Sequence, residues 1–98
     1  MTLPYTFHRL AASELEAAED SYEGERAGAG PRFATAVEAA ITLLRQHPEA
    51  APVLRGAIRG KAVHRYPYTI YYRVKGSALR ILAVAHQSRA PLYWLGRR

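Results

Sequence analysis

Hydrophobic positions follow two different spacings along the chain. In the first half, apolar residues recur three or four positions apart, which is the spacing of one helix face. The two stripes are Ala11, Leu15, Ala18, Tyr22 and then Phe33, Val37, Ala40, Ile41, Leu44. The second half instead carries continuous or alternating β-branched and aromatic residues, which are typical of strands. The pattern predicts two helices followed by a sheet.

Local signals indicate where the two helices begin and end. Ser13 and Glu16 fit a capping box, which predicts the start of the first helix near residues 11–13. Residues 28–31 (Gly-Ala-Gly-Pro) separate the helices, and Pro48 ends the second because the residue before a proline avoids helical angles. We therefore expect a helical hairpin over residues 11–47. The acidic residues of the first helix, which lie mostly off the stripe, are expected to face water: Glu14, Glu16, Glu19, Asp20, Glu23 and Glu25.

Four segments are predicted as strands. Residues 5–9 form a short alternating segment before the first helix, and residues 61–66, 68–74 and 79–85 follow the second. Pro67 separates the first two of these, and residues 75–78 (Lys-Gly-Ser-Ala) suit a turn. The order predicts a single α+β domain over residues 1–98. It has two layers: an N-terminal strand, a two-helix hairpin, then a three-stranded antiparallel meander packed on the helices.

Charge is distributed unevenly along the chain, whose net charge is +6. Residues 1–50 hold four bases and all eight acids, a net charge of −4, whereas residues 51–98 hold ten bases and no acid. A half with this balance attracts polyanions, either nucleic acid or an acidic protein partner. The alternative is a solvated surface without a partner.

The predicted strands indicate on which face of the sheet the basic side chains of the second half lie. Arg59, Lys61 and Arg65 share parity, although Val63 shares it too, so a bulge or extended side chains must resolve the conflict. Arg73 and Arg80 come from the next two strands, and Arg89 follows the last. We expect these six residues to form one basic patch on the sheet face that the helices leave uncovered.

The sequence lacks the residues or motifs that several kinds of functional site require. Cysteine is absent, which removes disulfides and thiolate chemistry and suits the cytoplasm. His8, His47, His64 and His86 contain no pair at helical spacing, so no metal is expected, and no cofactor motif is present. The serines lie outside any nucleophile elbow, and the glycines lack the ending of a phosphate loop. No apolar run has the length needed to span a membrane, and the first residues do not form a secretory signal.

The C-terminal segment allows two interpretations. His86, Arg89 and Tyr93, with Arg65 and Arg73 behind them, include the groups that a metal-free ribonuclease uses to move protons and stabilise phosphate charge. Alternatively, Tyr93 and Trp94 pack the end of the chain onto the sheet, and His86 simply ends a strand. The residues themselves leave both readings open.

The pattern of the second half resembles the RelE/ParE superfamily of type II toxin–antitoxin toxins. The resemblance rests on residues 66–68 (Tyr-Pro-Tyr), 70–72 (Ile-Tyr-Tyr) and 81–84 (Ile-Leu-Ala-Val), and on an ending of His86, Arg89, Pro91, Tyr93 and Trp94. It extends over nearly the whole chain, including the opening strand and both helices. It implies the two-layer fold expected above.

The superfamily has two functional branches. RelE-like toxins cut mRNA on the ribosome, and ParE-like toxins inhibit DNA gyrase. RelE-like nucleases place basic residues at positions that fall on Thr69 and Gln87 here, and neither side chain supplies a permanent charge. Tyr93 matches a nuclease tyrosine. The resemblance therefore favours the ParE-like branch, with an mRNA interferase or an inactive antitoxin-binding relative as alternatives.

The resemblance also implies partners and a role in plasmid stabilization. A cognate antitoxin is expected to fold a disordered segment across the sheet edge and the helical hairpin, giving a toxin–antitoxin hetero-oligomer. The tail then acts in docking and in closing the core, and DNA gyrase is the expected target. The expected partner-binding residues are Arg59, Lys61, Arg65, Arg73, Arg80, Arg89, Tyr93, Trp94, Arg97 and Arg98.

Overall fold

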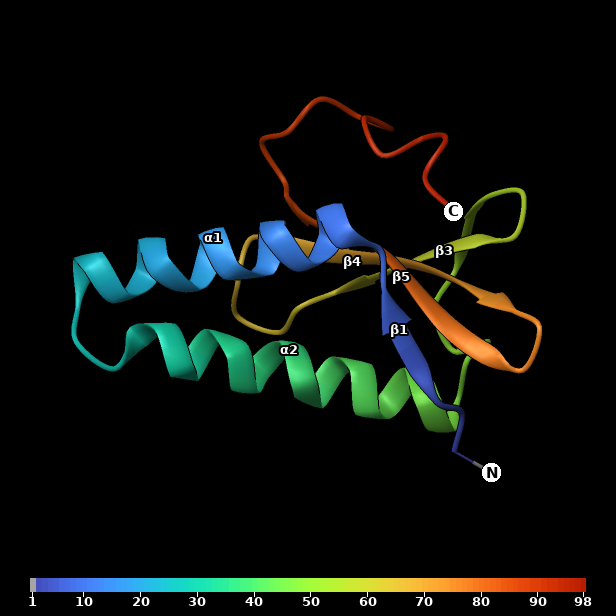
Figure 1. Cartoon of the computed structure of the whole chain (residues 1–98), viewed down its shortest axis with the longest axis horizontal. Coiled ribbons are helices and arrows are strands. Elements are labelled where there is room, and N and C mark those ends of the chain that lie inside the picture. Colours follow the sequence, from blue (N-terminus) through green and yellow to red (C-terminus); the bar gives the residue numbers. More distant parts are fainter. Residues whose placement is uncertain (1) are drawn as a thin grey trace.

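A computed structural model describes residues 2–98, in which two helices lie on one face of a five-stranded sheet (Figure 1). The elements are β1 (Tyr5–Phe7), α1 (Arg9–Glu25), α2 (Ala29–Gln46), β2 (Val53–Arg55), β3 (Ile58–Ala62), β4 (Tyr68–Lys75) and β5 (Ala78–His86). The strand order is β1-β5-β4-β3-β2, with β1 parallel to β5 and the other pairs antiparallel. The predicted α+β class is confirmed, and β2 is an addition that the sequence pattern did not reveal.

The first helix begins earlier than the capping box predicted. His8 is the N-cap, and its Nδ1 accepts a hydrogen bond from the Leu10 amide at 3.1 Å. The His8 amide in turn donates to the Ile81 carbonyl at 2.8 Å, so the end of β1 leads directly into α1. Ser13 and Glu16 therefore lie within the helix, and the capping-box prediction is wrong.

Two glycines allow the helices to connect and pack closely. Gly28, the N-cap of α2, has a φ of 87°, a conformation that favours glycine. A Cβ at Gly30 would lie 2.8 Å from the Glu19 carbonyl oxygen. The Glu23 carboxylate accepts hydrogen bonds from the amides of Gly28 and Gly30, which lowers the pKa of Glu23. The predicted break is confirmed at Gly28, whereas residues 29–31 already form the first turn of α2. Glu23 is the residue that satisfies the exposed amides.

The core lies between the helices and one face of the sheet. The predicted stripe of α2 is buried throughout, and Ala11 and Ala18 of α1 are buried with it. They pack in one cluster with side chains from β4 and β5, including Ile70, Tyr72 and Ile81. The Tyr72 hydroxyl donates to the Pro48 carbonyl at 2.8 Å, which gives a buried phenol its hydrogen-bond partner.

The third strand ends earlier than predicted. β3 stops at Ala62, and residues 63–67 form a turn in which Arg65 has a φ of 69°. The Val63 amide donates to the Tyr68 carbonyl, and the Val63 side chain is buried. Arg65 has therefore left the strand, whereas Arg59 and Lys61 keep the parity of Val63 and pair with residues of the helix-covered face.

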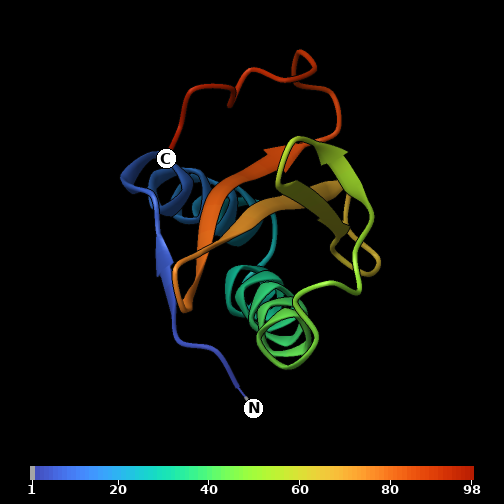
Figure 2. The ribbon, with the colours of Figure 1, turned by 90° about the vertical axis from the view of Figure 1, so that its right-hand side faces the viewer.

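The chain after β5 folds back over the sheet face that the helices leave open (Figures 1 and 2). Trp94 stacks on Tyr71 of β4, with ring centroids 4.6 Å apart, and is only 1% exposed. Tyr71 alternates with the core residues Ile70 and Tyr72, so it points to the opposite face. The C-terminal segment therefore closes a second, smaller apolar layer. Within residues 2–98, neither helix is long and apolar enough to cross a bilayer.

Candidate docking site and the C-terminal latch

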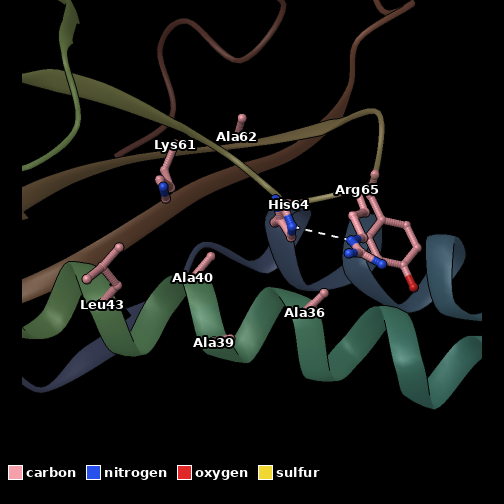
Figure 3. A pocket seen from close by; sticks show the side chains of 9 residues that line it. Ala36, Ala39, Ala40, Leu43, Lys61, Ala62, His64 and Arg65 are labelled. Carbon is pink, nitrogen blue, oxygen red and sulfur yellow. Dashed lines mark hydrogen bonds between the residues drawn. The ribbon is translucent and has the colours of Figure 1, made fainter.

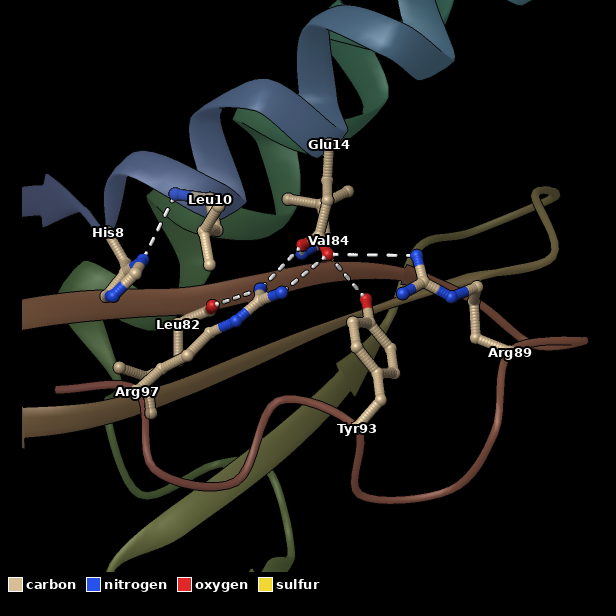
Figure 4. A network of polar contacts seen from close by, with 8 residues as sticks. All are labelled: His8, Leu10, Glu14, Leu82, Val84, Arg89, Tyr93 and Arg97. Carbon is tan, nitrogen blue, oxygen red and sulfur yellow. Dashed lines mark hydrogen bonds and ion pairs between the residues drawn. The ribbon is translucent and has the colours of Figure 1, made fainter.

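Glu14 connects the first helix to the C-terminal segment. Its Oε2 accepts from the Tyr93 hydroxyl at 2.8 Å, and Arg97 binds both carboxylate oxygens at 3.0 and 3.1 Å (Figure 4). The side chains of Glu14 and Arg97 are 14% and 12% exposed. Hydrogen bonds to charged groups in such surroundings are among the stronger ones in proteins. We call Glu14, Tyr93 and Arg97 the latch. The prediction that Glu14 faces water is wrong.

The latch also completes the edge of β5. The parallel strand β1 pairs with β5 only as far as Ile81, so the backbone beyond it has no strand partner on that side. The Val84 amide donates to Glu14 Oε1, and the Leu82 carbonyl accepts from Arg97, each at 3.0 Å. Side chains of the latch therefore replace the hydrogen bonds of a missing strand.

Two guanidinium groups flank the Tyr93 ring. The Arg89 guanidinium lies 3.8 Å from the ring centroid, and that of Arg97 lies 5.2 Å from it. Arg89 also approaches Glu14 at 3.9 Å, while half of its own side chain remains exposed. Burial, and next the hydrogen bond to Glu14, raise the pKa of Tyr93 well above its ordinary value of 10. Its hydroxyl is thus held as a hydrogen-bond donor.

The raised pKa of Tyr93 predicts a loss of stability in alkaline solution. Its folded pKa lies above the unfolded one, so the contribution is complete below about pH 10 and is lost as the pH rises further. We expect the wild-type melting temperature to fall above about pH 10 more steeply than that of Tyr93→Phe. Thermal unfolding over a series of alkaline buffers measures this difference. Parallel curves for the two proteins would contradict it.

The residues proposed for a nuclease are only partly brought together. His86, Arg89 and Tyr93 line one small pocket of about 180 Å³. His86 packs edge-on against Tyr68 at 5.1 Å, and its Nδ1 accepts from the Ser88 amide at 3.0 Å. The other two candidates lie elsewhere, Arg65 in the turn after β3 and Arg73 in β4.

The predicted single basic patch is wrong. Directly paired residues of antiparallel strands share a face, and Lys61 pairs with the core residue Ile70. Arg59 likewise pairs with Tyr72, and it donates to the carbonyls of Glu49 and Ala51. These side chains therefore lie on the helix side. Arg73 and Arg80 pair with each other on the opposite side.

A groove lies between α2 and the end of β3 (Figure 3). It has a volume of about 580 Å³ and is lined by Ala36, Ala39, Ala40, Leu43, Lys61, Ala62, His64, Arg65 and Tyr66. Its floor is apolar, and its charged residues are the bases Lys61 and Arg65 on one rim. The Leu43 side chain is 40% exposed. The signal for this groove in the sequence is that Ala36, Ala39 and Leu43 widen the apolar stripe of α2 beyond what one core face needs.

The order of elements is the one expected from the resemblance to the RelE/ParE superfamily of toxins. Residues 5–91 match the model of a family described as the ParE toxin of the type II toxin–antitoxin system, parDE. The chain belongs to this family, and it is the toxin component of a type II system with a cognate antitoxin as partner.

A solved structure shares the fold. It is described as the chromosomal ParDE TA system from P. aeruginosa, with a TM-score of 0.62 and 21% sequence identity. The match covers 87% of this chain and 96% of that one. At this identity the likeness concerns the fold alone. Among curated proteins, none matches the sequence significantly.

Proposed function

We propose that this toxin acts by binding DNA gyrase in the cytoplasm and not by cleaving RNA. The observation that carries the proposal is that the hydroxyl of Tyr93 is held as a hydrogen-bond donor to Glu14. Its hydroxyl donates to Glu14 and its pKa is raised, so it is poorly placed to take a proton from a substrate. Thr69 and Gln87 are uncharged where the RelE-like nucleases place bases. A tail fastened in one conformation suits docking, because less conformational entropy is lost on binding.

The exposed part of the tail supplies the proposed contact surface. Leu95 is 44% exposed, and Arg89 and Arg98 are exposed as well. Trp94 is buried and Arg97 is held in the latch, so we assign both of these predicted partner-binding residues to positioning. An apolar side chain with arginines around it fits an acidic protein surface.

Purified gyrase and a ribosome assay test the proposal together. With the toxin present, we expect gyrase to lose supercoiling activity or to accumulate cleaved DNA, while a reporter mRNA on translating ribosomes stays intact. Ribosome-dependent mRNA cleavage without an effect on gyrase would overturn the proposal. The shared pocket of His86, Arg89 and Tyr93 is the observation that favours this second candidate, the mRNA interferase. An inactive relative would affect neither assay.

We also propose that the antitoxin occupies the groove between α2 and β3 and forms a hetero-oligomer with the toxin there. An amphipathic segment would place apolar side chains on Leu43 and the alanines, with acidic residues toward Lys61 and Arg65. The apolar floor would bind the apolar side chains of the segment, and the basic rim would bind its acidic residues. Arg59 lies outside the lining of the groove, and its bonds to the carbonyls of Glu49 and Ala51 hold the segment that follows α2.

Leu43→Glu is expected to weaken antitoxin binding by about 100-fold or more, because it places a buried, unpaired charge in the interface. The substitution is tolerated in the free toxin because Leu43 is partly exposed. Leu54→Glu is the matched control, since Leu54 is 52% exposed on β2 and lies outside the groove. Calorimetric titration with the antitoxin measures both. Equal affinities for the two variants would place the antitoxin elsewhere.

A further inference from the structure

His8 lies where the end of β1, the start of α1 and the middle of β5 meet. Its Nδ1 accepts from the Leu10 amide at 3.1 Å, so the ring must be neutral in order to cap α1 (Figure 4). Its own amide donates to the Ile81 carbonyl at 2.8 Å. The common N-cap side chains accept through an oxygen, which still accepts at mildly acidic pH. A histidine cap instead loses its acceptor when the ring takes up a proton.

Positive charge surrounds the His8 ring. The guanidinium groups that act on it are those of Arg97 in the tail, Arg80 in β5 and Arg9 in α1. One carboxylate within residues 2–98, that of Glu14, acts in the opposite sense. Burial, and then the three guanidinium groups, lower the pKa of His8 below its ordinary value of 6.5. A proton on His8 would also add positive charge at the positive end of the dipole of α1.

Two of these arginines also hold the tail, which comprises residues 87–98. Arg97 binds Glu14 at 3.0 Å in the latch, and Arg80 Nε donates to the main-chain oxygen of Arg98 at 3.1 Å. A charge gained by His8 would therefore act on the groups that fasten the tail to the first helix and to β5. We propose that His8 is an acid-sensitive switch, whose protonation ends the capping of α1, repels the two arginines and loosens the tail. This inference concerns the isolated chain and does not depend on the target of the toxin.

The lowered pKa of His8 sets the direction of the effect on stability. The unfolded chain binds this proton more readily than the folded protein, so the contribution of His8 is complete above about pH 6.5 and is lost as the pH falls further. We compare wild type with His8→Asn, in which the amide oxygen caps the helix without titrating. Between about pH 7.5 and 5.5, the wild-type melting temperature should fall by about 4–8 °C more than that of the variant, the shift of one lost cap in a domain of this size.

Trp94 reports the state of the tail itself. It is the only tryptophan of the sequence and is 1% exposed, so acrylamide, an uncharged quencher, reaches it poorly while the tail is packed. We expect quenching in wild type to increase as the pH falls through the same range, at a temperature where helical circular dichroism is unchanged. Quenching in His8→Asn should stay constant. His47→Asn is the matched control, because it replaces an exposed histidine at the end of α2 and should respond like wild type.

His86 is the other histidine that could make the tail respond to pH. Its Nδ1 accepts from the Ser88 amide, and it lines the same small pocket as Trp94. If His86→Asn removes the change in quenching while His8→Asn retains it, the tail responds to His86 and the inference is wrong. Constant quenching of wild type over the whole range would also overturn it. A shift in melting temperature without a change in quenching would reduce His8 to a helix cap and would equally overturn the switch.

Discussion

Glu14→Leu is expected to lower the free energy of unfolding by about 3 kcal/mol. The substitution leaves the guanidinium of Arg97, the hydroxyl of Tyr93 and the amide of Val84 without their acceptor. Removing one partner of a largely buried charge pair typically costs about 3–5 kcal/mol, and the remaining exposure of Glu14 reduces this figure. Urea denaturation followed by circular dichroism measures the loss. Trp94 fluorescence should change as well, because the latch holds the tail that buries it.

Three further variants isolate the contribution of the latch. Glu16→Leu is the control for an added leucine on α1, since Glu16 is exposed, and it should change stability by less than about 0.5 kcal/mol. Arg97→Met, alone and with Glu14→Leu, completes a double-mutant cycle. We expect a coupling energy of about 1–3 kcal/mol, because the second substitution removes the charge that the first leaves unpaired. Additive losses would mean that the two side chains do not stabilise the protein as a pair.

The elements of the fold could be predicted where the apolar pattern was long and regular. The apolar stripe from Phe33 to Leu44 and the apolar residues of the run from Leu79 to Ala85 are buried as expected. Short elements were less predictable. β2 has three residues, all exposed, so no burial pattern distinguishes it from a loop. The start of α1 was misplaced because His8 is an uncommon cap, whereas Ser13 and Glu16 imitate a common one.

The candidate site depended on contacts between residues far apart in the sequence. Glu14 and Arg97 are separated by 83 positions, and a glutamate on a surface helix is solvated in most proteins. Helical spacing places Glu14, three residues after Ala11 and four before Ala18, at the edge of the buried stripe, but it does not indicate the partner. The split of the basic residues between two faces likewise follows from strand register, and a strand that ends at Ala62 rather than Tyr66 moves Arg65 into a turn. Tyr93 and Trp94 were identified from the motif, but only the structure separates their roles.

The structure also changes which experiment can reveal the role of the tail. Deleting residues 95–98 would remove Arg97 together with the exposed residues, so a loss of toxicity would reflect the broken latch as well as the lost contact surface. Leu95→Glu avoids this problem, because Leu95 is 44% exposed. Tyr93→Phe is also less neutral than its retained ring suggests. It removes a hydrogen bond to a charged group, which contributes about 1.5–3 kcal/mol to stability.

We expect Leu95→Glu to abolish toxicity, and His86→Ala and Tyr93→Phe to preserve most of it. In a docking toxin, a carboxylate in place of an apolar contact opposes binding to an acidic partner, whereas the two point changes leave the exposed surface intact. In a nuclease, loss of a proton-transfer group reduces the rate about 10²–10⁴-fold, so His86→Ala and Tyr93→Phe would then be the harmless proteins. Survival after induction, at protein levels matched by immunoblot, measures the difference.

Leu54→Glu controls for the added charge and should remain toxic, since β2 lies at the far edge of the sheet. Toxic Leu95→Glu together with harmless His86→Ala and Tyr93→Phe, and cleaved transcripts in the wild-type culture, would assign the tail to catalysis.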